Sequence, residues 1–298
     1  MTDLPLDQVR TLLAVVDEGT FDAAAAALHI TPSAVSQRVK ALEQRTGRVL
    51  LLRTKPVRPT ESGEVLVRLA RQVARLERDA RAELGLSGAG EPTRVSVAVN
   101  ADSLATWFLG ALTRLPPAAR LCFELRREDE AHTAALLREG TVMAAVTSSP
   151  DPVPGCSVRQ LGRMRYLPVA NPEFAARHLA GPLRRSLPEA PVVVFDRRDD
   201  FQDGFVRRLT RGGAEAGVWR HYVPTSEGFV EAVASGLGWG MVPEVQAAPL
   251  LRGGRLTVFA PDRATDVSLY WQQWRLDSPA LAEVADAVTR TARESLRR

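Results

Sequence analysis

Apolar residues recur every three or four positions in three short blocks within the first 60 residues, and this spacing predicts three helices. The first block ends at Gly19, a typical helix stop, and Thr20 suits the N-cap of an alanine-rich second helix. The third block starts with Thr31 as its expected N-cap and Pro32 at the first helical position, and its inward residues are Val35, Val39 and Leu42. Two short helices joined by a tight turn, the second polar on one face, are typical of a helix-turn-helix.

One longer helical pattern follows in residues 60–86. Its apolar positions alternate in steps of three and four, which is a heptad seam of Leu66, Leu69, Val73, Leu76 and Ala80. Such a seam indicates pairing with a partner helix, and burial against the helix's own domain is the alternative. Arg and Glu crowd the other faces, so we expect a homodimer, with a tetramer left open. A two-fold dimer would present two recognition helices to a pseudo-palindromic DNA site.

The pattern changes again after a Gly-, Ser- and Pro-containing stretch at 87–93, which predicts a boundary or hinge. From Val95 onward, strand-like runs alternate with helical ones. The strand-like runs are "VSVAV", "RLCFEL", "MAAVT", "APVVVFD" and "LTVF". This alternation predicts an α/β fold for the rest of the chain.

The distribution of charge tells more than its total, because the net charge of the 298 residues is only +4. Residues 36–58 hold seven basic residues and one acid, Glu43, whereas residues 1–35 hold five acids and a single arginine, Arg10. Positive charge is therefore concentrated on the third helix and the segment after it. That is the pattern expected for contacts with DNA phosphates, with a solvated charged face as the alternative.

Several classes of protein do not fit this sequence. Two cysteines, Cys122 and Cys156, cannot form a disulfide framework, and neither a signal peptide nor a membrane-spanning apolar run is visible. We therefore expect a cytoplasmic protein without a membrane partner. The four histidines lack metal-ligand spacing, "GLGWG" at 236–240 lacks the dinucleotide-binding pattern, and no nucleophile elbow or phosphate loop occurs. We expect no enzyme activity, no metal and no cofactor.

The N-terminal 86 residues resemble the LysR-type transcriptional regulators through "FDAAAAALHITPSAVSQRVKALEQRTGRVLLLRT" and "RPTESGEVLV". The resemblance extends to the rest of the chain. The stretches "VNADSLATW", "APVVVFDRRDD", "SEGFVEAVASGLGWGMVP" and "YWQQW", together with "TKPVRPTESG", are similar to the ArgP/LysG branch, which senses lysine and arginine and controls their export.

The resemblance implies three parts. They are an all-α winged helix-turn-helix domain (1–60), a linker and dimerisation helix with a hinge (61–92), and an α/β two-lobed, periplasmic-binding-protein-like effector domain (93–298). Lobe I would comprise 93–164 and 269–298, and lobe II 165–268. The implied protein binds double-stranded DNA, contacts RNA polymerase, and changes the angle between lobes or between dimers when L-lysine or L-arginine binds. The alternatives are an architectural or replication-control DNA-binding protein and a solute-binding module.

The resemblance also directs attention to the start of the third helix. Many relatives have a Gln-Pro pair there, whereas this chain has Pro32 and Ser33 after Thr31. Gln37 and Arg38, one turn further on, are therefore the expected contacts to base edges, because glutamine pairs with adenine and arginine with guanine. The expected phosphate contacts are Ser33, Ser36, Lys40 and Arg53, with Arg53, Lys55 and Arg58 on or beside the wing.

A lysine or arginine effector requires amides or hydroxyls for its carboxylate and acceptors for its two cationic groups. Polar residues suited to this lie at predicted strand ends and at the start of a helix: Asn100, Asp102, Ser103, Glu128, Thr147, Ser148, Asp196 and Ser226. Each has a plainer alternative. Asp102 and Ser226 could be helix N-caps, and Asp196, in "DRRDD", could form a surface ion pair. If Asp102 is a cap, its carboxylate occupies the helix amides and repels a ligand carboxylate, so the two roles of Asp102 nearly exclude each other.

Overall fold

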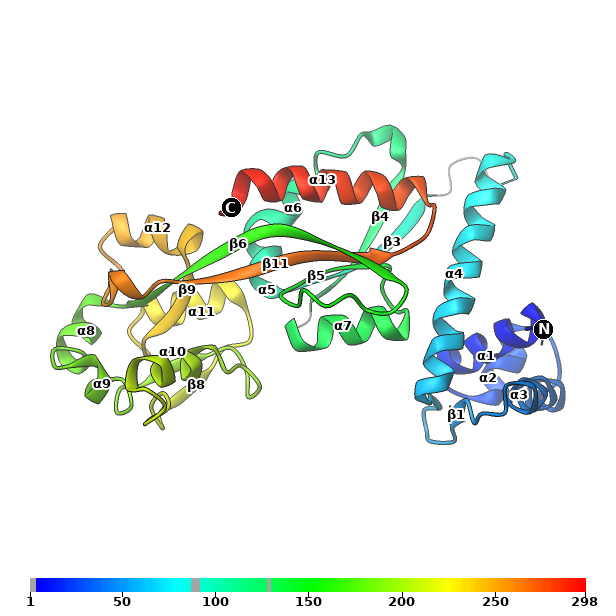
Figure 1. Cartoon of the computed structure of the whole chain (residues 1–298), viewed down its shortest axis with the longest axis horizontal. Coiled ribbons are helices and arrows are strands. Elements are labelled where there is room, and N and C mark those ends of the chain that lie inside the picture. Colours follow the sequence, from blue (N-terminus) through cyan, green and yellow to red (C-terminus); the bar gives the residue numbers. More distant parts are fainter. Residues whose placement is uncertain (1–3, 87–91, 128–129) are drawn as a thin grey trace.

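The computed structural model describes residues 4–86, 92–127 and 130–298, and it consists of a small helical domain, one long helix and a larger two-lobed domain (Figure 1). The small domain contains α1 (Leu6–Glu18), α2 (Phe21–Ala27) and α3 (Pro32–Thr46), followed by a two-stranded antiparallel wing of β1 (Leu51–Leu52) and β2 (Arg58–Pro59). The predicted helix-turn-helix is confirmed, and the wing adds two short strands to a domain that was expected to be all-α.

The predicted helix ends of the small domain are confirmed by their hydrogen bonds and backbone angles. The Thr20 hydroxyl accepts from the Ala23 amide at 3.1 Å, and the Thr31 hydroxyl accepts from the Ala34 amide at 3.2 Å. Gly19 follows α1 with a φ of +74°, a left-handed conformation that favours glycine. The sequence therefore determines where these helices begin and end through local chemistry alone.

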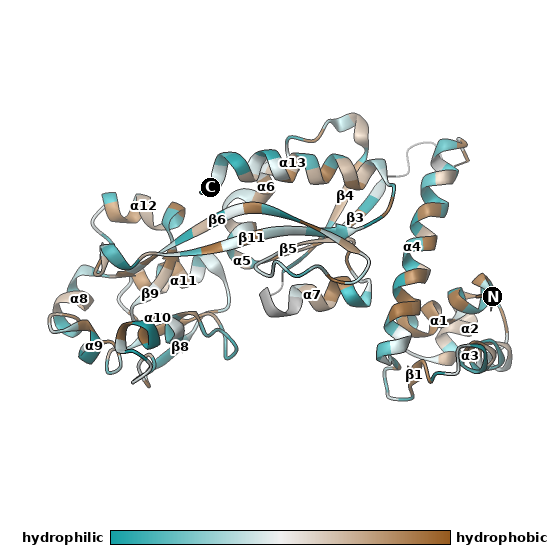
Figure 2. Ribbon diagram, viewed as in Figure 1, coloured by the Kyte–Doolittle hydropathy of each residue, from teal (hydrophilic) through white to brown (hydrophobic). Residues whose placement is uncertain are grey.

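The long helix α4 (Glu61–Glu83) is partly buried by its own domain. Leu66 lies in the core of the small domain and Leu69 packs against that core, so these two seam residues are already covered within the chain. Burial within the chain favours the alternative for these two residues, and their pairing with a partner helix stays a prediction. Leu76 is 43% exposed, and hydrophobic residues (brown in Figure 2) continue along the part of α4 that projects beyond the small domain. The distal half of the seam, from Val73 onward, likewise stays a prediction for dimerisation.

The larger domain is built on one seven-stranded sheet whose main path runs β10-β6-β11-β5-β3-β4. In lobe I, β3 (Thr93–Val99) lies parallel to β4 (Leu121–Arg127) and β5 (Ala144–Thr147). The helices of lobe I are α5 (Ala101–Ser103), a π-helical turn (Leu104–Phe108) and α6 (Leu109–Leu112) in one continuous run, α7 (Glu130–Glu139), and α13 (Pro279–Ser295); a 3₁₀ turn spans Pro117–Ala119. They cover both faces of the sheet (Figure 1).

Two long antiparallel strands, β6 (Cys156–Ala170) and β11 (Thr265–Trp274), connect the lobes. The expected lobe boundaries, at 164/165 and 268/269, fall inside these strands, so the two crossovers are continuous strands and not loops. Lobe II adds β7 (Val192–Val194) parallel to β8 (Arg220–Tyr222), and β9 (Gly240–Pro243) and β10 (Thr257–Val258) paired with β6. Its helices are α8 (Pro172–His178), α9 (Leu183–Ser186), α10 (Phe201–Thr210), α11 (Ser226–Ala234) and α12 (Glu244–Arg252), with a 3₁₀ turn at Pro261–Arg263.

Within the described residues, no helix is both long and apolar enough to cross a membrane.

Candidate functional site

The outer face of α3 presents a row of exposed polar side chains. Ser33, Ser36, Gln37 and Lys40 are all exposed, while Val35, Val39 and Leu42 on the opposite face are buried in the core of the small domain. The exposed residues are separated by steps of three and four, so they share one face of the helix. Such a face is suited to insertion into the major groove of DNA.

Arg38 lies off this face, and its contact with a base edge stays a prediction. At about 100° per residue, Arg38 lies roughly a quarter turn round the helix from Gln37. Its guanidinium instead donates to the Thr11 hydroxyl at 3.4 Å and lies 3.7 Å from the Asp7 carboxylate, both on α1. The side chain therefore joins α3 to α1.

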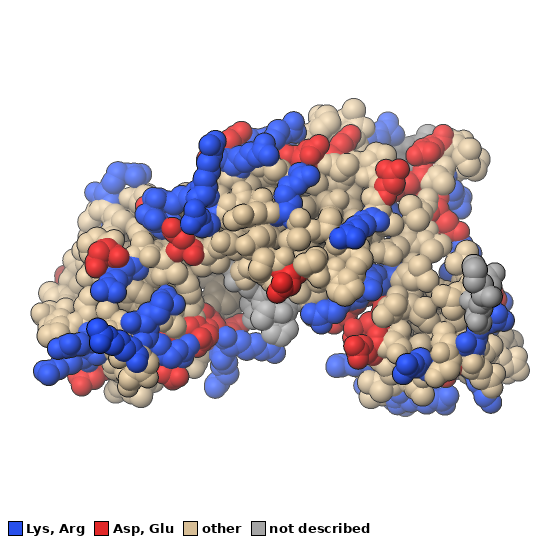
Figure 3. Space-filling view, viewed as in Figure 1, with Lys and Arg blue, Asp and Glu red and all other residues tan. Residues whose placement is uncertain are grey.

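The wing extends the basic surface next to α3. Arg53, Lys55 and Arg58 are exposed on β2 and on the loop between β1 and β2. Figure 3 shows Lys and Arg side chains (blue) along the lower edge of the small domain. The predicted concentration of charge is thus present as a surface, and its contacts with phosphates remain a prediction.

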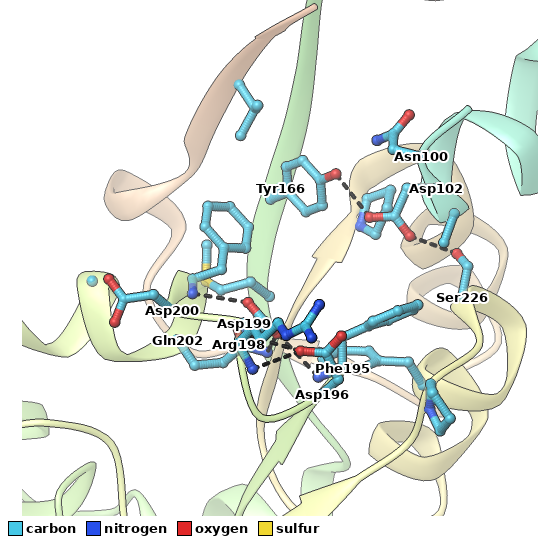
Figure 4. A pocket seen from close by; sticks show the side chains of 18 of the residues that line it. Asn100, Asp102, Tyr166, Phe195, Asp196, Arg198, Asp199, Asp200, Gln202 and Ser226 are labelled. Atoms are coloured by element: carbon cyan, nitrogen blue, oxygen red, sulfur yellow. Dashed lines mark hydrogen bonds between the residues drawn. The ribbon is translucent and has the colours of Figure 1, made fainter. Parts of the chain in front are cut away.

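A cavity of about 630 Å³ lies between the two lobes. Its walls come from the ends of β3 and β4 in lobe I, the crossover strands β6 and β11, and the 195–208 segment and the start of α11 in lobe II. Of the sequence-predicted residues, Asn100, Asp102, Asp196 and Ser226 line it (Figure 4). Residues that are far apart in the chain therefore meet at this place.

Asp102 connects lobe I to lobe II and to a crossover strand. One oxygen of its carboxylate, Oδ2, accepts from the Tyr166 hydroxyl at 2.8 Å, and the other, Oδ1, accepts from the Ser226 hydroxyl at 2.6 Å. The N-cap position of the helix belongs to Asn100, and the two partners of the Asp102 carboxylate are hydroxyls and not helix amides. The N-cap alternative for Asp102 is therefore wrong, and the helix amides are not occupied by its carboxylate.

Burial raises the pKa of Asp102, although the hydrogen bonds from Ser226 and Tyr166 act to lower it. The charge of nearby Asp199 raises the pKa of Asp102 further. The hydrogen-bond partners of this carboxylate are both neutral, and it forms no ion pair within the described part of the chain. A positively charged ligand would supply the missing charge.

A second group of acids lies across the cavity in the loop between β7 and α10. Asp196 accepts from the amides of Arg198 at 2.7 Å and Asp199 at 3.1 Å. Asp199 accepts from the amides of Phe195 at 3.0 Å and Phe201 at 2.9 Å. Burial raises the pKa of Asp199, while these two backbone hydrogen bonds act to lower it. The backbone thus fixes both carboxylates at the cavity wall, so Asp196 lies in the cavity and not on an outer surface.

Asn100 and Ser226 provide further polar groups. The Asn100 side-chain oxygen is buried and has no hydrogen-bond partner within the described part of the chain, so an incoming donor could satisfy it. The N-cap of α11 is Thr225, whose hydroxyl accepts from the Gly228 amide at 3.2 Å. The cap alternative for Ser226 is therefore wrong, and its hydroxyl points to Asp102.

Three other predicted residues lie outside the cavity wall. Ser103 is fully buried. Thr147 is also buried, and its hydroxyl bonds the backbone of Ser149. Ser148 is not among the lining residues. Strand β5 is short and its end turns into this local loop, which explains why its polar end does not reach the cavity. The remaining prediction, Glu128, lies outside the described residues.

Sequence reasoning missed several residues that line the cavity. Tyr166 lies within β6, where no local pattern marks a ligand contact. Asp199 belongs to the same "DRRDD" run as Asp196, so the run was recognised but the more buried acid was not. The missed positive charges are Arg127, Arg198 and Arg208.

The described wall thus carries four carboxylates and three guanidiniums. The carboxylates are Asp102, Asp196, Asp199 and Asp200. This mixture suits a ligand with one carboxylate and more than one cationic group. No cluster of three or more potential metal ligands occurs in the described chain.

Two family models match the chain. The first, described as "Bacterial regulatory helix-turn-helix protein, lysR family", matches residues 6–64. The second, described as "LysR substrate binding domain", matches residues 88–293. Among similar proteins, the transcriptional regulator LysG of Mycobacterium tuberculosis is 48% identical over 98% of this chain and 95% of that protein. The lysine export transcriptional regulatory protein LysG of Corynebacterium glutamicum is 44% identical over 97% of this chain and 98% of that protein.

Solved structures agree with these relatives. Full-length LysG from Corynebacterium glutamicum with bound effector Arg has a TM-score of 0.86 at 43% identity, covering 99% of this chain and 100% of that one. Another full-length structure of the same regulator, described without an effector, covers the same shares at the same identity but has a TM-score of 0.62. This chain as a whole therefore superposes better on the first structure than on the second.

Proposed function

This chain belongs to the LysR family of DNA-binding transcriptional regulators, and on that premise we propose that it binds L-lysine or L-arginine between its lobes and controls a gene for basic amino-acid export. The observation that carries the proposal is the pair of partly buried carboxylates, Asp102 and Asp199, which lie at opposite walls of the interlobe cavity and whose pKa values are both raised by desolvation. An ammonium or guanidinium would compensate each charge. The relatives named for lysine export and the LysG structure with bound Arg support the same ligand class.

The proposed orientation follows from where each charge lies. The α-ammonium is held by Asp102, whose two oxygens face Tyr166 and Ser226 (Figure 4). The α-carboxylate, on the neighbouring carbon, lies at the amides that begin α11, because a helix N-terminus favours negative charge. The side-chain cation then reaches the group of Asp196 and Asp199 on the opposite wall.

For DNA recognition we propose that α3 enters the major groove. Gln37 reads a base edge, while Ser33, Ser36 and Lys40 contact phosphates, and the wing residues Arg53, Lys55 and Arg58 contact the backbone beside them. Thr31 and Pro32 begin the helix at the DNA surface. We further propose that two chains pair through the distal part of α4, around Val73 and Leu76, with a tetramer as the larger assembly. We also propose that the DNA-bound regulator contacts RNA polymerase, and that it does so in the cytoplasm.

Calorimetry with L-lysine and L-arginine tests the effector, with L-leucine and L-glutamate as controls of unlike charge. We expect the two basic amino acids to bind and to change the footprint on the export-gene promoter, and the controls to do neither. Binding of leucine or glutamate in preference, or no change in the footprint, would contradict the proposal. A salt titration on operator DNA tests the DNA contact, since a regulator that neutralises phosphates loses affinity steeply as salt rises.

A further inference from the structure

Three arginines on one face of α4 tie the long helix to lobe I. Arg68, Arg71 and Arg75 are separated by steps of three and four, so they point to the same side of the helix. They are distinct from the hydrophobic seam and from the proposed DNA contacts. Each of them contacts the effector domain.

Arg68 and Arg71 hold the C-terminal end of α7. Arg68 Nη1 donates to the Arg138 carbonyl at 3.2 Å, and Arg71 Nη1 donates to the Glu139 carbonyl at 2.9 Å. The last carbonyls of a helix lack internal partners and carry partial negative charge, so guanidiniums are well suited to them. Arg71 also pairs with Asp17 on α1 at 2.5 Å. One side chain therefore contacts the effector domain and the DNA-binding domain together.

Close approach at this joint depends on Gly140. Its φ of +73° is one that side chains rarely adopt, and an added Cβ would lie 3.0 Å from the Arg68 Cα. The end of α7 thus packs directly against the backbone of α4.

Arg75 holds the beginning of β3 and α13. Its side chain is 3% exposed, donates to the Arg94 carbonyl at 3.1 Å and the Ser278 hydroxyl at 3.2 Å, and pairs with Asp79 at 3.0 Å. A buried guanidinium that is bonded to three partners fixes these elements relative to α4.

Two of the three held elements of lobe I, α7 and β3, lead to the interlobe cavity. β3 leads to Asn100 and Asp102, and Arg127, the residue that ends β4 just before α7, lines the cavity. Figure 1 shows α7 lying lengthwise between the cavity side of lobe I and α4. An α-helix of ten residues spans about 15 Å and seven strand residues span about 23 Å, so each element crosses lobe I.

We propose that Arg68, Arg71 and Arg75 form an intramolecular docking contact through which the state of the effector cavity determines the position of the DNA-binding domain. Movement of lobe I on effector binding is carried by α7 and β3 to α4, and by the Arg71–Asp17 pair to α1. The inference rests on the proposed function for the identity of the effector. The two full-length LysG structures superpose on this chain to different extents, with TM-scores of 0.86 and 0.62.

The test compares the full-length double variant Arg68→Ala/Arg71→Ala with the matched control Arg78→Ala. Arg78 lies exposed on the same helix and makes no hydrogen bond or ion pair within the described chain, so its removal gives the loss of charge without loss of docking. For wild type we expect lysine or arginine to change operator affinity by about 5- to 150-fold, the usual range of allosteric coupling. In the double variant we expect the ratio of operator affinities with and without effector to fall towards one, while the affinity for the effector stays within about threefold of wild type. Arg78→Ala should keep the wild-type ratio.

A second readout works without any effector. Hydrogen exchange of the peptide covering residues 136–142 should accelerate in the double variant and in Gly140→Ala, which disturbs the joint without changing charge, but not in Arg78→Ala. If wild type binds neither lysine nor arginine, the proposed function fails, and hydrogen exchange alone then decides the docking contact. The inference is overturned if hydrogen exchange of this peptide in the double variant is as slow as in wild type. It is also overturned if lysine or arginine changes the operator affinity of the double variant by the same factor as in wild type.

Discussion

Replacing Asp102 by asparagine separates the ligand role of this carboxylate from its structural role. The asparagine side chain would keep the shape of the aspartate and one oxygen acceptor, but it would lack the negative charge that faces the cavity. The Ser226 and Tyr166 hydroxyls, at 2.6 and 2.8 Å, can still donate to or accept from an amide. We therefore expect Asp102→Asn to fold and to keep the cavity.

The expected loss in affinity comes from one charge-assisted hydrogen bond. Such bonds contribute about 1.5 to 3 kcal/mol, which corresponds to roughly 10- to 150-fold weaker binding of lysine or arginine. The stability of the effector-free protein, by contrast, should not fall. Burial raises the pKa of Asp102, so its ionised form destabilises the folded state at neutral pH, and removal of that charge should raise the melting temperature or leave it unchanged.

Calorimetry and thermal unfolding with and without effector measure both effects, and Asp151→Asn is a matched control. Asp151 is exposed in lobe I, and its side chain makes no hydrogen bond or ion pair within the described chain. The control should bind lysine as wild type does. Unchanged effector affinity in Asp102→Asn would refute the assignment of the ammonium to this carboxylate. A lowered melting temperature together with unchanged affinity would show that Asp102 is a structural bridge only.

Four other perturbations test the same structure. An ammonium binds the ionised form of Asp102, and burial raises the pKa of this carboxyl. The affinity for lysine should therefore rise as pH increases from about 4 through that raised pKa, and then level off. Calorimetry across pH checks this, and a flat profile would contradict it. Lys40→Ala should weaken binding to operator and non-operator DNA alike, and should reduce the slope of log affinity against log salt by about one. Gln37→Ala should instead relax discrimination at one base pair by about 1–3 kcal/mol. Gel-shift titrations on single-base operator variants would show both effects. Asp203→Ala should destabilise the protein by about 3 kcal/mol, because it removes the acceptor of the Ala216 amide and the only carboxylate bonded to Arg220 within the described chain, leaving Arg220 the Ala216 carbonyl. Denaturant unfolding measures this, and a loss below about 1 kcal/mol would refute it. Burial alone would raise the pKa of Asp203, but Arg220 and the Ala216 amide outweigh it and lower the pKa, so this contribution is present above about pH 4 and is lost as pH falls through the lowered pKa.

The small domain was predictable in detail because its signals are local. Thr31, Pro32 and Gly47 mark the ends of α3 through caps and backbone preference, and the buried face follows from helical spacing. Arg38 shows where that reasoning stops. It is polar and near exposed residues in sequence, but the turn of the helix directs it to α1, and only the packed neighbour shows this.

The cavity was predictable only in part. Strand ends predicted Asn100, Asp102 and Asp196, since ligands bind at the carboxyl ends of the strands of α/β sheets. Asn100 and Asp102 follow β3 in lobe I, and Asp196 follows β7 in a separate sheet of lobe II. The same rule failed for Thr147, because β5 runs into a loop that uses the hydroxyl locally. Tyr166 could not be found, because it lies within a strand and reaches the cavity only through the crossing of β6 between the lobes.

The sequence by itself determined the helix-turn-helix, the caps of its helices, the concentration of basic charge and the α/β character of the rest, because each depends on residues within one or two turns. The tertiary structure alone decided the role of Asp102 and the roles of the α4 arginines. Asp102 meets Ser226 across 124 positions of the chain, and Arg75 meets Ser278 across 203. Contacts at such separations depend on how the sheet, the crossovers and the long helix pack, and no local pattern in the chain records that packing.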